Sequence, residues 1–240
     1  MRHLVTSDIH LGNHFSRGRQ FTTMVQRLNS SITLVLAGDI VDAPGGLLSK
    51  DDVVALDAIR NRASNEQVIW IEGNHDKGYR PEESGNIQFV DSYALDKRLY
   101  IVHGDQFVGI KMFRNALFLK TFKLFHNLRI LFGADPIHVA DYAKKFHVLY
   151  GFLRRKIMNC AVEYGHEKNF KAVACGHVHF AEDTIHEGIR YINLGAWTEA
   201  TNHCLLVNEE KMELITIENA MQDSEWFTTE LSYNEAEMVK

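Results

Sequence analysis

The sequence predicts an α/β fold built from two β-sheets, and three observations support this prediction. The chain has 240 residues, of which 45% are hydrophobic, so it can bury one substantial core. Five short apolar runs have the pattern of strands buried on both faces: residues 4–6, 32–36, 68–71, 99–102 and 172–174. Helix-like stretches at residues 21–28 and 53–63 separate the first three runs, as expected for βαβ units.

The C-terminal part of the chain predicts a second sheet packed on the first. Glu187-Gly188 is a turn signal between apolar residues, which favours a hairpin over residues 185–192. Two further apolar runs, residues 205–207 and 214–217, have the length of strands.

Charge is unevenly distributed along the chain. The formal net charge is -5 and the isoelectric point is near 6.2, which argues against a general nucleic-acid-binding protein. Residues 107–160 nevertheless contain ten basic residues and two acidic ones. We expect one domain over residues 1–220 that contains a helical insertion at residues 107–165, followed by an acidic tail or appended helix over residues 221–240.

Cysteine usage and hydropathy indicate a cytoplasmic protein. Cys160, Cys175 and Cys204 are odd in number and show no C-x-x-C spacing, so we expect reduced thiols rather than disulfides or a zinc knuckle. No signal-peptide pattern is present at the N-terminus, and no stretch of about 18 uncharged apolar residues follows. Attachment to a membrane surface is compatible with this pattern.

Five short polar blocks carry the residue types of a metal site. They are Asp8-Ile9-His10, Gly38-Asp39, Gly73-Asn74-His75-Asp76, His103-Gly104-Asp105 and Gly176-His177-Val178-His179. Four blocks directly follow an apolar run and the first ends one, so the sheets can bring all five to one edge. Residues i and i+2 of an extended segment point the same way, which lets each D-x-H or H-x-H pair hold one metal region. The glycines beside the ligands allow sharp turns and close approach to the backbone.

The residue types in these blocks select the kind of metal. Carboxylate, amide and imidazole groups without thiolates favour manganese, iron or zinc over a structural zinc cage, and manganese is the expected ion. We expect seven ligands for two divalent cations: Asp8, His10, Asp39, Asn74, His103, His177 and His179. Two cations about 3.5–4 Å apart repel each other, so they need a shared carboxylate, and Asp39 is the predicted bridge.

The order of the blocks resembles the calcineurin-like metallophosphoesterase family over about residues 4–207. The resemblance implies a four-layer αββα sandwich and attack on phosphorus by a water or hydroxide between the metals. It implies that one metal is held by Asp8, His10, Asp39 and His179, and the other by Asp39, Asn74, His103 and His177. It also implies two catalytic residues: His75 would stabilise the phosphoryl charge or protonate the leaving oxygen, and Asp76 would orient its imidazole.

Within that family the chain resembles bacterial UDP-2,3-diacylglucosamine pyrophosphohydrolases of lipid A biosynthesis. The resemblance rests on the helical insertion, on its apolar and basic content, and on Leu194-Gly195-Ala196-Trp197. It implies cleavage of UDP-2,3-diacylglucosamine to UMP and 2,3-diacylglucosamine 1-phosphate at the inner membrane, with Asn74, His75 and His177 contacting the acylated sugar nucleotide. The chain departs from the best-known branch at His75, where that branch has arginine.

The insertion has two interpretations. Residues 139–161 place apolar side chains at helical spacing, with basic residues on the other side: Lys144, Lys145, Arg154, Arg155 and Lys156. The helices either pack on each other and on the sheet, or form a lid with an apolar groove near Phe118 and Phe122. In the second case the basic rim would contact phosphates or an anionic membrane surface, and we favour this interpretation because it explains the charge segregation.

Two other functions stay open at this stage. A phosphodiesterase or phosphatase for a soluble phosphoester would share the metals but would need no apolar groove. A non-catalytic phosphoesterase-like scaffold would usually have lost His75 or several ligands, and here every expected ligand is present. The sequence makes no prediction of the oligomeric state.

Overall fold

The computed structural model describes residues 1–108, 142 and 144–229, which form two sheets and the helices that cover them. The first sheet contains β1 (Arg2–Thr6), β2 (Ile32–Ala37), β3 (Val68–Ile71), β4 (Ile87–Val90), β10 (His203–Val207) and β11 (Met212–Thr216). The second contains β5 (Ser92–Leu95), β6 (Leu99–Val102), β7 (Ala172–Cys175), β8 (Glu182–His186) and β9 (Ile189–Asn193). The helices are α1 (Gly18–Arg27), α2 (Lys50–Asn65), the short η1 (Asp105–Val108), α6 (His147–Lys168) and α7 (Ile217–Ala220).

Both sheets are mixed, and their parallel strands end at the same level. The strand orders are β11-β10-β1-β2-β3-β4 and β5-β6-β7-β9-β8. Thr6 at the end of β1 pairs with Leu36, and Ala37 at the end of β2 pairs with Ile71 at the end of β3. In the second sheet β6 and β7 are also parallel. The segments that follow these strands therefore leave the sheets along a common edge.

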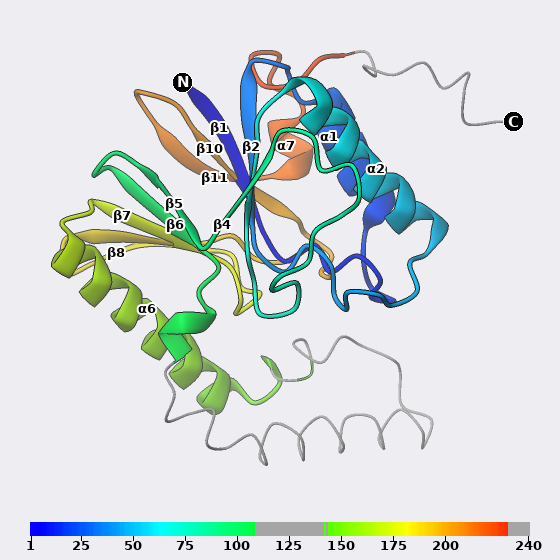
Figure 1. Ribbon diagram of the computed structural model, residues 1–240. Coiled ribbons are helices and arrows are strands. Elements are labelled where there is room, and N and C mark those ends of the chain that lie inside the picture. The colour runs from blue at the N-terminus through cyan, green and yellow to red at the C-terminus, as the bar shows by residue number, and fades with distance from the viewer. Residues whose placement is uncertain (109–141, 143, 230–240) are drawn as a thin grey trace, which may run out of the picture.

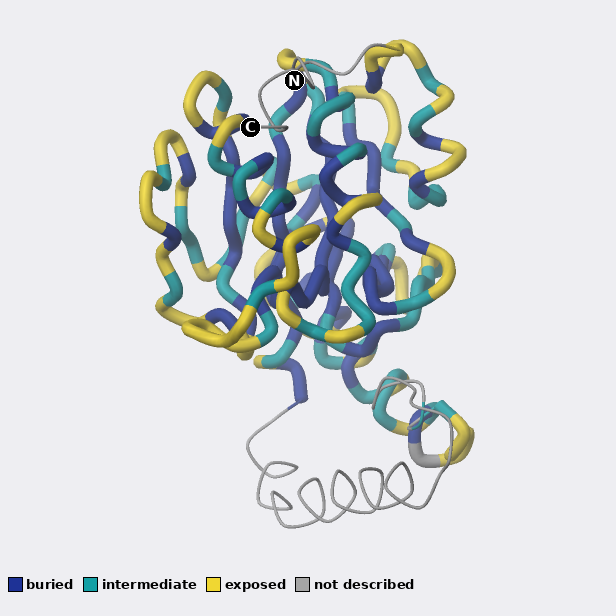
Figure 2. Tube along the Cα trace, turned by 90° about the vertical axis from the view of Figure 1, so that its right-hand side faces the viewer, coloured by how far each residue is buried: buried dark blue, intermediate teal, exposed yellow. Residues whose placement is uncertain are grey.

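Three apolar layers make the predicted four-layer αββα sandwich, which is confirmed. Phe21 and Ile59 pack α1 and α2 on the first sheet, and Ile69 and Ile101 belong to the layer between the sheets. A third layer, which includes Ile157, joins α6 to the second sheet. Figure 1 shows α1 and α2 on one side of the paired sheets and α6 on the other. Figure 2 shows that the buried residues concentrate along the central strands.

Most of the strands follow the apolar runs predicted from the sequence. β1, β2 and β3 are buried along nearly their whole length, as expected for strands covered on both faces. The expected hairpin is the antiparallel pair β8 and β9. β4 and β5 were not predicted, because each has four residues, lies at a sheet edge and is largely half-exposed or exposed.

A capping box fixes the start of α2 close to the loop that follows β1. The Ser49 side chain accepts from the backbone N–H of Asp52, and the Asp52 carboxylate accepts from the backbone N–H of Ser49. Asp52 also accepts from the Ser16 hydroxyl and from the backbone N–H of Gly12. One buried carboxylate thus ties α2 to the segment that follows Asp8 and His10.

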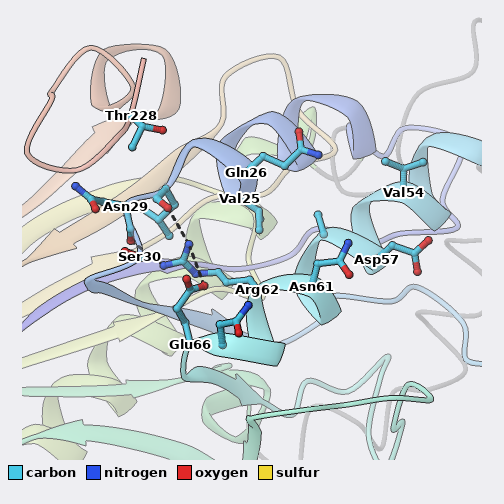
Figure 3. A pocket seen from close by; sticks show the side chains of 13 residues that line it. Val25, Gln26, Asn29, Ser30, Val54, Asp57, Asn61, Arg62, Glu66 and Thr228 are labelled. Atoms are coloured by element: carbon cyan, nitrogen blue, oxygen red, sulfur yellow. Dashed lines mark hydrogen bonds and ion pairs between the residues drawn. The ribbon is translucent and has the colours of Figure 1, made fainter. Parts of the chain in front are cut away.

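The buried guanidinium of Arg62 on α2 holds the chain that leads into β2. It donates to the carbonyl oxygens of Leu28, Asn29 and Ile32 at 2.9, 2.9 and 2.5 Å. Arg62 also lines a pocket of about 320 Å³ between α1 and α2 (Figure 3). This pocket lies beside the residues that precede β2, whereas Asp39 follows β2, so it is at the opposite end of the strand from the predicted metal ligands.

The domain extends beyond the predicted boundary at residue 220. Trp226 and Phe227 are buried in the layer between the helices and the first sheet, and Phe227 forms a β-bridge with Leu28. The backbone N–H of Thr228 donates to the carbonyl of Arg27. Residues 221–229 therefore belong to the domain, because two large apolar side chains are inserted into its core. Residues 230–240 of the expected tail lie outside the described residues.

Only part of the predicted insertion lies within the described residues. The second half of α6 packs on the second sheet and forms the outer layer of the sandwich. Phe118 and Phe122, which we expected to line an acyl groove, lie outside the described residues. The three cysteines are free, as expected. Within the described ranges no helix has the length and apolar character needed to cross a bilayer.

Candidate metal centre

The five polar blocks meet at the common edge of the two sheets. The backbone N–H of His177, after β7 in the second sheet, donates to the Asp8 carboxylate, after β1 in the first sheet, at 3.0 and 3.2 Å. His103, after β6, donates from Nδ1 to the carbonyl of Ala37 at the end of β2. These contacts join the two sheets where their parallel strands end, so residues far apart in the sequence form one site.

A first group of ligand atoms comes from Asp8, His10 and His179, and all three residues are buried. The Nε2 atoms of His10 and His179 are 3.2 Å apart. Oδ1 of Asp8 lies 3.2 Å from Nε2 of His179 and 3.8 Å from Nε2 of His10. Oδ2 of Asp39 is 4.0 Å from Nε2 of His10, so Asp39 lies at the border of this group.

A second group comes from Asp39, His103 and His177. Oδ2 of Asp39 is 3.2 Å from Nε2 of His103, and Nδ1 of His177 is 3.3 Å from the same nitrogen. Oδ1 of Asn74 lies 3.3 Å from Nε2 of His103. All seven predicted ligands are thus brought together, and Asp39 lies within reach of both groups; its role as the bridge stays a prediction.

The spacing of these atoms fits two cations. Ligand atoms about 2.1 Å from a metal, at angles of 90–109° to one another, lie roughly 3.0–3.4 Å apart. Most of the distances within each group fall in this range. Because Nδ1 of His103 donates to the Ala37 carbonyl, a neutral His103 ring would turn an acceptor, Nε2, toward two other acceptors, Oδ2 of Asp39 and Oδ1 of Asn74. A cation among them removes this conflict, and the absence of thiolates fits manganese, iron or zinc.

Neighbouring acceptors select the ring nitrogen that two of the histidines present to the metals. Nδ1 of His10 lies 2.8 Å from the Asp42 carboxylate, and Nδ1 of His103 lies 3.1 Å from the Ala37 carbonyl. Each acceptor holds a proton on Nδ1 and leaves Nε2 as the ligand atom. Such outer partners orient the ring and increase its basicity.

Without metal, protons on the histidines balance the buried carboxylates. Burial raises the pKa of Asp8, but the charges and hydrogen bonds of the surrounding histidines, His179 first among them, lower it overall. Burial lowers the pKa of His103, yet the hydrogen bond and charge of Asp39 raise it to about 10. Burial and the charge of His103 lower the pKa of His177 to about 3, so this ring is neutral. The cations would replace the protons that the site otherwise holds.

Two glycines leave room for the ligand carboxylates. A Cβ atom at Gly73 would lie 2.2 Å from Oδ1 of Asp39, and one at Gly176 would lie 2.0 Å from Oδ2 of Asp8. No side chain fits at either position, because a ligand carboxylate lies against the backbone there.

His75 and Asp76 occupy different environments, and this corrects one prediction. Nδ1 of His75 lies 2.8 Å from the carbonyl and 3.4 Å from the carboxylate of Asp42. The Asp76 carboxylate instead accepts from the backbone N–H groups of Ile40 and Gly73 and from Nε1 of Trp70. The expectation that Asp76 orients the His75 imidazole was wrong, because Asp76 is completely buried beneath the ligand loops while the His75 side chain is 40% exposed.

Asp42 is the residue that the sequence analysis missed. It contacts both His10 and His75, and burial alone would raise its pKa, but the hydrogen bond and charge of His10 lower it to about 2. Its carboxylate is therefore ionised and helps to raise the pKa of His10. The available signal was its position three residues after Asp39, in the same loop.

The close approach at Gly176 leads to a first prediction. We expect Gly176→Ala to lower the affinity for divalent metal strongly, because the new methyl group would displace the Asp8 carboxylate. Gly151→Ala on α6 is the control, since its nearest neighbour would be 3.7 Å away. Metal content after purification and dialysis measures the effect; equal metal content in the two variants would contradict the assigned geometry.

The different environments of Asp42 and Asp76 lead to a second prediction. Asp76→Asn should lower the free energy of unfolding of the metal-free protein by about 1–3 kcal/mol, because an amide cannot accept from all three buried donors. Asp42→Asn should change stability much less but lower phosphoesterase turnover by about 10–100-fold. Urea unfolding and hydrolysis of a chromogenic phosphodiester separate the two effects. If Asp76→Asn lowered turnover and Asp42→Asn lowered stability instead, Asp76 and not Asp42 would be the partner of His75.

Comparison with known proteins places the chain in a family. The profile of the calcineurin-like phosphoesterase family matches residues 1–181. Solved structures with a similar arrangement include the phosphoesterase YfcE from E. coli, at 15% identity and TM-score 0.45, covering 91% of this chain and 94% of that one. A novel archaeal phosphodiesterase has 14% identity and TM-score 0.43, covering 90% of this chain and 99% of its own.

Zinc-bound Vps29 from Entamoeba histolytica has 13% identity and TM-score 0.43, covering 90% of this chain and 99% of that one. No curated protein matches the chain. These structural similarities are too low to support a functional argument, so the assignment rests on the family profile and on the ligand groups. The chain is a metal-dependent phosphoesterase and belongs to the calcineurin-like phosphoesterase family.

Proposed function

We propose that the chain hydrolyses a soluble phosphodiester or phosphomonoester with two divalent cations. The observation that carries this proposal is the pair of adjacent ligand groups, with Oδ2 of Asp39 in the second group 4.0 Å from Nε2 of His10 in the first. When bound, the cations would lower the pKa of water and balance the charge of the phosphoryl group. The three predicted substrate contacts lie at the open side of the site: Asn74 and His75 are exposed and His177 is half-buried. Their polar side chains suit a soluble phosphoester.

The side chains around the metals have distinct tasks in this proposal. His75 donates from Nδ1 to the Asp42 carbonyl, which leaves Nε2 for the phosphoryl oxygen or for the leaving oxygen. The Asp42 carboxylate lies 3.4 Å from the same Nδ1 and helps to hold the imidazole in this orientation. The backbone N–H of His75 donates to Oδ1 of Asp39, which directs the other carboxylate oxygen toward the ligand groups.

A second candidate substrate is UDP-2,3-diacylglucosamine, and one observation favours it. An exposed face of α6 carries Val148, which is 86% exposed, and Phe152, which is 57% exposed, between the exposed basic residues Lys145 and Arg155. Such a face suits acyl chains and anionic headgroups. The Leu194–Trp197 motif is weaker support, because Trp197 is buried and donates to the Thr6 hydroxyl, so its role is to hold the end of β1.

A substrate panel tests both candidates. With manganese we expect hydrolysis of bis(p-nitrophenyl) phosphate or p-nitrophenyl phosphate that a chelator abolishes and added metal restores. Each CH₂ group of an acyl chain that is buried on binding contributes up to about 0.8 kcal/mol to the binding free energy. An acyl-specific enzyme would therefore prefer UDP-2,3-diacylglucosamine over UDP-N-acetylglucosamine by orders of magnitude in kcat/KM. Equal kcat/KM values would exclude acyl recognition. Absence of any hydrolysis with manganese, iron or zinc would contradict the proposed activity.

The α6 face also supports a proposed attachment to anionic membranes, with a separate test. Two of the basic residues expected on this surface are ion-paired instead: Lys144 with Glu199 and Arg154 with Glu182. We expect the double variant Lys145→Gln, Arg155→Gln to sediment less with phosphatidylglycerol vesicles at low salt. Each basic residue near an anionic membrane contributes about 1 kcal/mol to the free energy of binding. Lys144→Gln is the control. Wild-type protein that stays in the supernatant at low salt would rule out this partner.

A further inference from the structure

The ligand residues adopt a strained backbone that needs external support. Asp8, His10, Asp39, His177 and His179 have φ values of 54°, 52°, 54°, 68° and 52°. This left-handed region is unfavourable for a residue that carries a Cβ atom. Such conformations persist only where the surrounding structure holds them in place. The segment from His177 to His179 needs the most support from its surroundings, because two of its three residues have a left-handed backbone. Each of these two residues supplies a ligand to a different group.

Within the described part of the chain, hydrogen bonds to its backbone groups hold this segment, and one of them comes from α6. The backbone N–H of His177 donates to Asp8, and that of Val178 donates to the carbonyl of Gly176 at 2.8 Å. The carbonyl of Val178, midway between the two histidines, accepts from the Tyr150 hydroxyl at 2.5 Å. Tyr150 lies in the first turn of α6 and is only 9% exposed, so this hydrogen bond is shielded from water.

Three further contacts tie α6, or the residues just before it, to segments that follow the two histidines in sequence. One turn beyond Tyr150, the Arg154 guanidinium lies 3.4 Å above the centre of the Phe180 ring, directly after His179. The same guanidinium donates to Glu182 at 2.8 Å. Before α6, Lys144 pairs with Glu199, beyond the second sheet. The start of α6 is therefore attached both to the ligand segment, through Tyr150, and to the residues that follow it, through Arg154.

We propose that Tyr150 is a positioning residue that sets the backbone of residues 177–179 and thereby couples α6 to the metal centre. A shift of the Val178 carbonyl rotates the peptide units on both sides of it, and so moves the rings of His177 and His179 together. Movement of α6, for example when a ligand contacts its exposed face, therefore changes the affinity for metal. The inference rests on the metal site of the proposed function and not on the identity of the substrate.

Tyr150→Phe tests the proposal, because it removes the hydroxyl and keeps the ring. Tyr164→Phe is the matched control: Tyr164 lies on the same helix, but its ring stacks on Tyr100 at 4.8 Å, away from the ligands. We expect Tyr150→Phe to weaken Mn²⁺ binding in calorimetric titration by about tenfold and to alter the visible absorption spectrum of the Co²⁺-loaded protein. Tyr164→Phe should leave both unchanged, although both variants lose a hydroxyl from α6.

A second variant keeps the test independent of Tyr150. Arg154→Gln removes the contact with Phe180 and weakens the one with Glu182, and we expect it to weaken Mn²⁺ binding in the same direction. Unchanged affinity and spectrum in Tyr150→Phe would overturn the proposal, and so would an equal loss in Tyr164→Phe. Failure of the proposed function is distinct, because the wild-type protein itself would then bind no metal.

Discussion

Two buried negative charges impose the main constraint on this molecule. Asp8 and Asp39 are 0% and 2% exposed, and both lie at the edge where the two sheets meet. Burying a carboxylate without a partner is costly, so positive charge must be present nearby. Protonated histidine supplies it when metal is absent, and divalent cations supply it when they are bound. The structure of the loops at this edge therefore depends on whether protons or metal ions occupy the site. Protons and metal ions compete for the same histidine nitrogens.

The sequence predicted the ligand set because strand ends are easy to locate in it. Asp39, His103 and His177 each follow an uninterrupted apolar run with one residue or none between, and parallel strands in level register bring such positions together. Gly73 and Gly176, which precede Asn74 and His177, also marked the site in the sequence. The structure explains why they are glycines, since no side chain fits at either position. The four-layer order followed from the family resemblance, whereas the alternation of strands and helices predicted only the βαβ units of the first sheet.

Long-range pairing of side chains could not be predicted in the same way. Asp76 is adjacent to His75 in sequence, yet its carboxylate points under the loops toward Ile40 and Gly73. Lys144 and Arg154 belong to a basic segment, but their acidic partners come from distant parts of the chain. Trp226 and Phe227 are core residues, but they lie in an acidic stretch of sequence, so they were not predicted to be buried. In each case the deciding partner is visible only after the chain has folded.

The exposure of the site is one-sided. Most of the ligands are buried, whereas Asn74 and His75 are exposed. In the proposed reaction, the ester substituent of a phosphoryl group at the metals would have more room on the side of Asn74 and His75 than on the side of the buried ligands. In the proposed reaction these ligands would hold the phosphate group that all such esters share. Selectivity consequently depends on parts of the chain that can vary during evolution without disturbing the metals, and a single ligand arrangement can then serve chemically unrelated esters.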